Sequence, residues 1–122
     1  MRLLYVDDDR INTFLFEETC RLSPGLEVRC AHTGQDGLDQ AREFRPDVLV
    51  IDLHLPDTDG YALLAELRAL DGLAERPAYL CSAEMPDVIA EPAAQAGFTG
   101  VWNKPVSLQD MLADLARLQR DN

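Results

Sequence analysis

The chain has 122 residues, with 22 acidic and 11 basic side chains and a formal net charge of −11. That charge disfavours nonspecific binding to nucleic acids or anionic membranes, and no apolar stretch approaches the length of a membrane span. Asp7 falls where a signal peptide would need its hydrophobic segment, so we expect a cytoplasmic protein. Cys20, Cys30 and Cys81 are far apart and odd in number, which is typical of buried, reduced thiols and not of disulfides or a zinc site.

Short apolar runs alternate with helix-like segments along the whole chain. Runs expected to form strands lie at residues 3–6, 26–30, 48–51, 78–81 and 100–102. Intervening segments have apolar residues at helical spacing, which in chain order are Ile11, Phe14, Leu15 and Leu22, then Leu63, Leu67 and Leu70, and finally Leu108, Met111, Leu112, Leu115 and Leu118. Strands separated by single helices pair in parallel, and a continuously apolar run such as 48–51 is typical of a strand covered on both faces. The sequence therefore predicts one α/β domain over residues 1–122, a doubly wound (βα)5 sandwich with a five-stranded parallel sheet.

Polar residues mark where several helices are expected to begin. Asp9 is expected to cap the first helix, and Ser107 the last, with Asp110 in the capping-box position. The DTDG stretch within residues 55–66 imitates a calcium loop, but Leu55 occupies its first ligand position and a strand leads into it. We therefore expect Asp59 to begin the third helix instead of binding calcium.

Pro92 lies inside segment 87–97, where the fourth helix is expected. A proline in a helix interior removes a hydrogen bond and costs about 3 kcal/mol. We therefore expect this helix to be short, to be kinked or to begin at Pro92, with residues 85–91 loosely held.

Polar side chains follow four of the five expected strands. In open parallel sheets, ligands bind beyond the carboxyl ends of the strands, so these residues should gather at one edge. They are Asp7, Asp8 and Asp9 after the first strand, Asp52 after the third, Ser82 at the end of the fourth and Lys104 after the fifth. Each has a plainer explanation by itself, as a helix or turn cap or a solvated lysine, but their joint placement favours a site.

Clustered aspartates suit a hard cation such as Mg2+, which prefers oxygen ligands. A cation held by Asp7 or Asp8 together with Asp52 would cancel the repulsion between neighbouring carboxylates and neutralise a phosphoryl group. Lys104 and the Ser82 hydroxyl are suited to contact phosphoryl oxygens. Asp52, on a central strand between cation and lysine, is then the expected nucleophile.

These residues resemble the receiver domains of two-component response regulators over essentially the whole chain. The shared pattern consists of V-D-D at residues 6–8, D-L-x-L-P-x-x-D-G at 52–60, the hydroxyl of Ser82, and K-P at 104–105. The resemblance implies a flavodoxin-like topology and transfer of a phosphoryl group to Asp52 from a phosphohistidine of a sensor histidine kinase or phosphotransfer protein. It implies that Asp7, Asp8 and the backbone carbonyl of His54 help to hold Mg2+ with Asp52. It also implies that Ser82 and Lys104 contact the phosphoryl group, and that the bond before Pro105 is cis.

Several positions depart from the family pattern or vary within it. Family members usually carry an aromatic residue three positions before the lysine, where this chain has Val101 with Trp102 beside it. We expect Trp102 to lie near the surface that signals or, alternatively, to be a partly buried packing residue. His54 and Glu84 occupy positions that flank the phosphoryl group in this family and tune its loss.

Two other functions remain as alternatives. One is a receiver-like interaction module that no longer takes phosphate. The other is a Mg2+-dependent phosphohydrolase with an aspartate nucleophile, although such an enzyme would need an acid where His54 stands and a substrate cap. The sequence does not identify the output target, a possible homodimer or whether the chain stands alone or is part of a larger signalling protein.

Overall fold

The computed structural model describes residues 1–104 and 106–120, so the cis bond expected at Pro105 lies outside the described residues. Its strands are β1 (Arg2–Val6), β2 (Glu27–Ala31), β3 (Val48–Asp52), β4 (Ala78–Ser82) and β5 (Gly100–Asn103). Its helices are α1 (Arg10–Cys20), α2 (Gly34–Phe44), α3 (Gly60–Arg68), α4 (Pro86–Ala96) and α5 (Leu108–Arg120). All five strands pair in parallel in the order β2-β1-β3-β4-β5, which confirms the expected doubly wound sheet. Among the described residues, no helix is long and apolar enough to cross a membrane.

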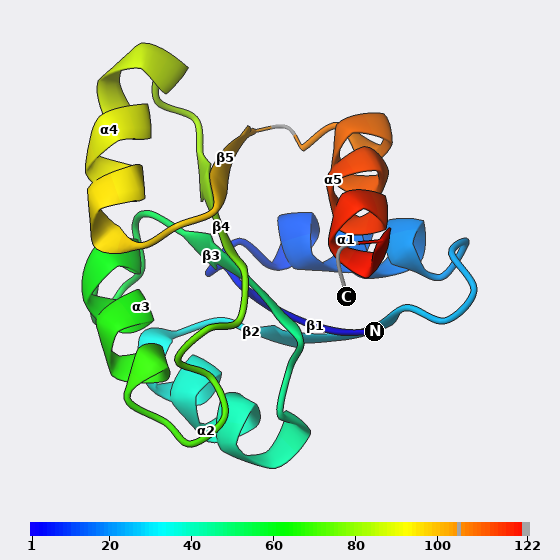
Figure 1. The fold of residues 1–122 in the computed structure, drawn as a ribbon, viewed down its shortest axis with the longest axis horizontal. Helices are drawn as coiled ribbons and strands as arrows, with labels where there is room; N and C mark the ends of the chain where they lie inside the picture. Colours follow the sequence, from blue (N-terminus) through cyan, green and yellow to red (C-terminus); the bar gives the residue numbers. More distant parts are fainter. Residues whose placement is uncertain (105, 121–122) are drawn as a thin grey trace.

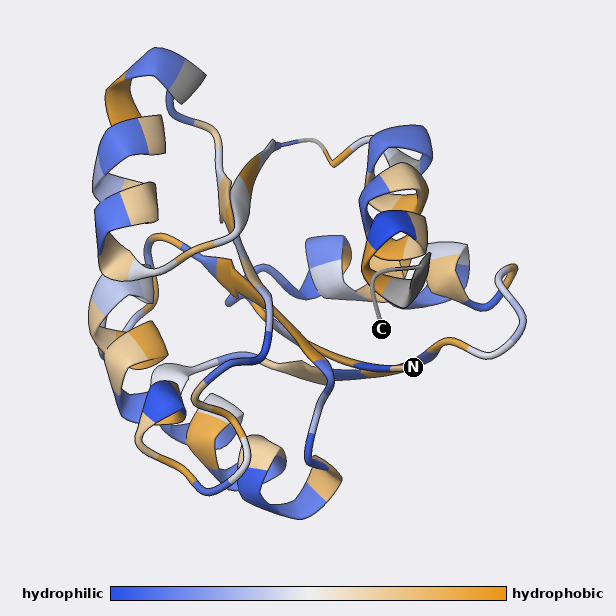
Figure 2. Cartoon of the chain, viewed as in Figure 1, coloured by the Kyte–Doolittle hydropathy of each residue, from blue (hydrophilic) through white to orange (hydrophobic). Residues whose placement is uncertain are grey.

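Helices cover both faces of the sheet, with α1 and α5 on one side and α2, α3 and α4 on the other (Figure 1). Alternate strand residues point to opposite faces, so each strand supplies both layers of the core. From β1, Leu4 and Val6 face the α2–α4 side, whereas Leu3 and Tyr5 face the α1–α5 side. The sheet is accordingly hydrophobic through the middle of the molecule, while the helices carry polar residues outward (Figure 2).

The apolar residues whose spacing predicted the first helix do lie in α1, except Leu22, but they face away from the core. Ile11, Phe14 and Leu15 are 56–71% exposed, and Leu22 lies beyond the helix end. The residues of α1 that are buried are instead Thr13, Phe16 and Cys20. Phe16 packs against Tyr5 of β1 with ring centroids 4.4 Å apart, so contact with the sheet sets the rotation of α1.

The predicted effect of Pro92 on α4 is wrong in two respects. The helix is as long as α1 and begins at Pro86, where a missing N–H costs nothing because the first turn has no intrahelical acceptor. It continues through the exposed Pro92 to Ala96, because Ile89 and Ala93 are buried against the sheet side of the helix. A bend of its axis at Pro92 stays a prediction.

Trp102 is buried, at 5% exposure, which favours the packing role expected as the alternative over a place on the signalling surface. Its indole stacks on Tyr79 with ring centroids 4.5 Å apart, and its N–H donates to Asp114 Oδ2 at 2.7 Å. Val101 points to the opposite face and packs, half-buried, against the α2–α4 core. Because adjacent strand residues face opposite ways, Trp102 does not take the place of an aromatic at position 101.

Helix caps follow the expected residues. Asp9 accepts hydrogen bonds from the N–H groups of Ile11 and Asn12, and Asp59 accepts one from Ala62 N–H. Ser107 Oγ accepts the N–H of Asp110 at 3.3 Å. The three cysteines are free, but only Cys20 and Cys81 are buried; the expected burial of Cys30 is only partial.

Candidate functional site

The strand register brings the polar residues expected at the strand ends to one edge of the sheet. Val6 of β1 pairs with Ile51 of β3, so Asp7 and Asp52 follow at the same level. Asp52 pairs with Cys81, which puts Ser82 one step beyond, and Lys104 N–H donates to the Ser82 carbonyl at 2.9 Å. Parallel pairing thus converts separated sequence positions into one cluster.

Three carboxylates and one ammonium form the centre of this cluster. One oxygen from each of Asp7, Asp8 and Asp52 lies within 4.8 Å of the others. Lys104 Nζ lies 2.9 Å from Asp7 Oδ2 and 3.2 Å from Asp52 Oδ2. Asp7 and Asp52 are buried and Asp8 is exposed, so the cluster is open on the side of Asp8. Asp9 lies outside it, as the cap of α1.

Asp7 is the most enclosed of these carboxylates and has three hydrogen-bond donors. Its Oδ2 accepts from Tyr5 Oη at 2.7 Å and from Lys104, and its Oδ1 accepts from Asp9 N–H at 3.0 Å. Burial opposes ionisation of Asp7, but the bonds from Lys104, Asp9 and Tyr5 outweigh it and hold its pKa below the usual value. Asp7 is therefore a fixed negative charge of the site.

Asp52 is perturbed in the opposite direction. Burial, followed by the negative charge of Asp7, raises its pKa to about 6, although Lys104 opposes the shift. Burial alone would lower the pKa of Lys104, but its bond to Asp7 and the charge of Asp52 raise it above the usual value. At neutral pH Asp52 is therefore ionised although burial and the nearby charge of Asp7 disfavour its negative charge, and Lys104 beside it is positively charged.

Ser82, His54 and Glu84 lie around the rim. Ser82 is buried, and its Oγ accepts the N–H of Glu84 at 3.0 Å. The Glu84 carbonyl accepts from Asn103 Nδ2 at 3.0 Å, which ties the loop after β4 to the end of β5. His54 Nε2 lies 3.2 Å from Glu84 Oε1, with both side chains largely exposed. This pair joins the loops that follow β3 and β4.

The donor set fits a small, hard divalent cation. Carboxylate oxygens are ligands that Mg2+ prefers, and three negative charges against one lysine leave a net negative cluster. Asp8, which is exposed, and Asp52, which borders it, are the residues best placed to hold such an ion. The role expected for the His54 carbonyl stays a prediction.

The sequence pattern did not indicate the contacts that three residues make at the site. Tyr5 was counted only as a strand residue, yet its hydroxyl contacts Asp7. Asp57 accepts from the N–H groups of Gly34 and Gln35, and so ties the loop after β3 to the start of α2. Gly60 lies so close to β3 that a Cβ atom there would come within 2.9 Å of the Asp52 carbonyl oxygen. The D-G pair was a visible signal for Gly60, but the other two contacts depend on tertiary packing.

Comparisons with known proteins agree on one family. The family model described as "Response regulator receiver domain" matches residues 3–116. The chain is 34% identical over 119 residues to the transcriptional regulatory protein PrrA of Mycobacterium leprae, an alignment that covers 98% of this chain and 50% of PrrA. It is 36% identical over 109 residues to protein-glutamate methylesterase/protein-glutamine glutaminase 5 of Myxococcus xanthus, covering 88% of this chain and 31% of that protein.

Solved structures agree with this result. The chemotaxis response regulator CheY4 of Vibrio cholerae superimposes with a TM-score of 0.86 at 25% identity, covering 95% of this chain and 96% of that one. By contrast, the chain spans half or less of the length of the two curated relatives above.

Proposed function

This chain belongs to the response regulator receiver domain family, and we propose that it acts in a phosphorelay by accepting a phosphoryl group on Asp52. The donor is the phosphohistidine of a sensor histidine kinase or a phosphotransfer protein, and the reaction depends on Mg2+. The observation that carries this proposal is that the Asp52 carboxylate lies in one cluster with Asp7, Asp8 and Lys104 at the carboxyl edge of the sheet.

Each residue has a defined task in the proposed transfer. A carboxylate oxygen of Asp52 attacks phosphorus, the phosphorus–nitrogen bond of the donor histidine breaks, and an acyl phosphate forms. Lys104, which pairs with Asp52 before the reaction, is close enough to pair with an oxygen of the incoming group. Ser82 lies beside the same carboxyl edge and supplies a hydroxyl donor. Mg2+, held by Asp8, Asp52 and Asp7, would neutralise charge on the transferred phosphoryl group.

His54 and Glu84 are proposed to modulate loss of the phosphoryl group. Their contact spans the loops after β3 and β4, which border Asp52 and Ser82. A pair in this position restricts the direction from which water approaches an acyl phosphate on Asp52. Because both side chains are exposed, a bound partner can separate them at little energetic cost.

The exposed face of α1 is proposed as the contact for the phosphodonor protein. Ile11, Phe14 and Leu15 form an apolar surface within the first two turns after Asp9, next to the acidic edge. A hollow of about 130 Å³ between α1 and α5 continues this surface from Leu15 to Lys104. An apolar face that leads to the reacting carboxylate suits a partner that must bring a histidine to Asp52.

Intact-mass measurement tests the central proposal. The protein is incubated with a small phosphodonor and Mg2+, with Asp52→Asn as the comparison. We expect one phosphoryl adduct in the wild type, no adduct in the variant, and no adduct when a chelator precedes the donor. Absence of an adduct in the wild type would contradict the proposal and favour an interaction module that does not take phosphate.

A further inference from the structure

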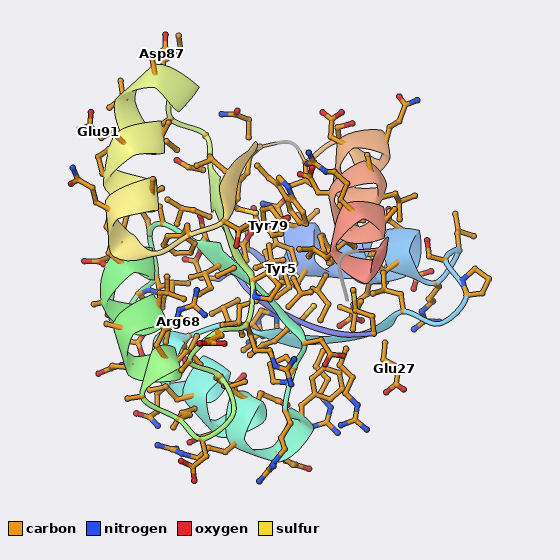
Figure 3. All side chains as sticks on the ribbon, in the orientation of Figure 1. Tyr5, Glu27, Arg68, Tyr79, Asp87 and Glu91 are labelled. Atoms are coloured by element: carbon orange, nitrogen blue, oxygen red, sulfur yellow. The ribbon has the colours of Figure 1, made fainter. Side chains whose placement is uncertain are left out.

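Tyr5 brings a buried hydroxyl to the acidic cluster from the core. The side chain is 2% exposed, and its O–H donates to Asp7 Oδ2 at 2.7 Å. Asp7 follows β1 directly, and its N–H still donates to the Ala31 carbonyl of β2 at 3.0 Å, so Asp7 and Tyr5, two residues apart, face the same side. The phenol ring packs against Phe16 of α1, which restricts its movement. Figure 3 places Tyr5 in the layer between the sheet and α5, together with Tyr79.

This hydroxyl shares one oxygen atom of Asp7 with Lys104. Asp7 Oδ2 accepts from both Tyr5 and Lys104, whereas Oδ1 accepts from the N–H of Asp9. Burial raises the pKa of Tyr5 well above its ordinary value, so the hydroxyl keeps its proton and donates to the carboxylate. The Tyr5 hydroxyl and the Lys104 ammonium group therefore both donate to Oδ2, and Lys104 also contacts Asp52.

We propose that Tyr5 is a positioning residue, whose hydroxyl fixes the orientation of the Asp7 carboxylate and thereby sets the affinity of the acidic cluster for Mg2+. The inference rests on the function proposed above, in which that cluster holds the ion. Without the hydroxyl, Asp7 Oδ2 keeps Lys104 as its partner and turns further towards the ammonium group. The carboxylate then neutralises more of the positive charge of Lys104, and less of its negative charge is available to stabilise a bound cation.

Groups that hydrogen-bond to metal ligands commonly change metal affinity by about 10-fold or more when they are removed. We expect Tyr5→Phe to raise the dissociation constant for Mg2+ by about 10-fold. The variant keeps the aromatic ring and its contact with Phe16, so the fold is retained. Tyr79→Phe is the matched control, because it deletes a phenol from the same buried layer at a residue that makes none of the described bonds to Asp7.

The experiment measures urea unfolding of each variant in chelator and over a series of Mg2+ concentrations. The rise in unfolding free energy with Mg2+ yields the dissociation constant by mass action, independently of any change in the stability of the metal-free protein. The same pair of substitutions is then made in an Asp7→Asn background, in which the ligand charge of residue 7 is absent. If Tyr5 acts through Asp7, its effect on Mg2+ affinity falls to less than about 2-fold there.

An unchanged Mg2+ dissociation constant in Tyr5→Phe, or a change no larger than in Tyr79→Phe, would overturn this role for Tyr5. So would an effect of equal size with and without the Asp7 carboxylate. Failure of Mg2+ to stabilise the wild type would instead contradict the cation site of the proposed function. The two failures are therefore distinguishable in one data set.

Discussion

Asp52→Asn is expected to stabilise the Mg2+-free protein, although it removes the proposed phosphoacceptor. Burial and the charge of Asp7 make ionised Asp52 unfavourable in the folded state, and Lys104 only partly offsets this. The amide has nearly the same shape as the carboxylate but carries no charge. Lys104 still has Asp7 as a partner at 2.9 Å, so the substitution leaves no unpaired buried ammonium.

The size of the effect follows from the pKa of Asp52, which is raised from 3.8 to about 6. A difference of about two units corresponds to about 3 kcal/mol, since each unit is worth about 1.4 kcal/mol. Above pH 6 the carboxyl is ionised in both the folded and the unfolded chain, so the full free energy of about 3 kcal/mol destabilises the folded wild type. Below about pH 4 it is protonated in both, so the advantage of Asp52→Asn should disappear.

Urea unfolding in chelator from pH 4 to pH 8 measures this dependence. At pH 7.5 we expect the variant to be more stable by about 2–3 kcal/mol, or by about 10 °C in melting temperature. Added Mg2+ should reduce the difference, because it stabilises only the wild-type cluster strongly. Asp57→Asn is the control, and we expect it to lower the unfolding free energy at pH 7.5. Hydrogen bonds from the N–H groups of Gly34 and Gln35 lower the pKa of Asp57 and so favour its ionised form in the folded protein. A destabilised Asp52→Asn variant, or a difference that does not change with pH, would refute the electrostatic reasoning.

Three further predictions concern the frame around the site. Gly60→Ala should lower the unfolding free energy by about 1–3 kcal/mol, because a Cβ atom would collide with the backbone of β3; an unchanged urea midpoint would contradict that close approach. Phe14→Glu should change the unfolding free energy by less than about 0.5 kcal/mol, because Phe14 is exposed, but it should slow phosphoryl transfer from a donor protein and not from a small phosphodonor. Phe16→Ala, at a buried residue, should lower the unfolding free energy by about 3–5 kcal/mol in the same assay. Trp102→Phe should cost about 1–3 kcal/mol by loss of packing and of the bond to Asp114, without reducing phosphoryl-adduct formation measured by mass; a loss of the adduct would show that Trp102 belongs to the site.

Local rules in the sequence were sufficient for the architecture and for the positions of the polar residues. Apolar runs separated by single helices predicted the parallel sheet, because a crossover helix returns the chain to the same edge. That edge then collects whatever follows each strand, which is why Asp7, Asp52 and Lys104 were expected to lie close together and do. Caps such as Asp9 were predictable because their hydrogen bonds reach only two or three residues along the chain.

Tertiary contacts decided the features on which the sequence was ambiguous or misleading. The residues of α1 offer two apolar faces, and packing of Phe16 on Tyr5 selected the one that leaves Phe14 exposed. In α4, burial of its sheet-facing side chains outweighed the hydrogen bond lost at Pro92. In α4 a local cost of about 3 kcal/mol thus competed with burial of a helix face, and burial prevailed.

The electrostatics of the site also came from the fold. The sequence by itself determined which charges meet at the carboxyl edge, because strand order and parallel pairing bring the strand ends together. Only the tertiary structure decided that Asp7 is enclosed with three donors while Asp52 is left strained beside it. The physical reason is that a pKa depends on burial and on distances of a few ångströms between residues remote in sequence, and these exist only once the chain has folded.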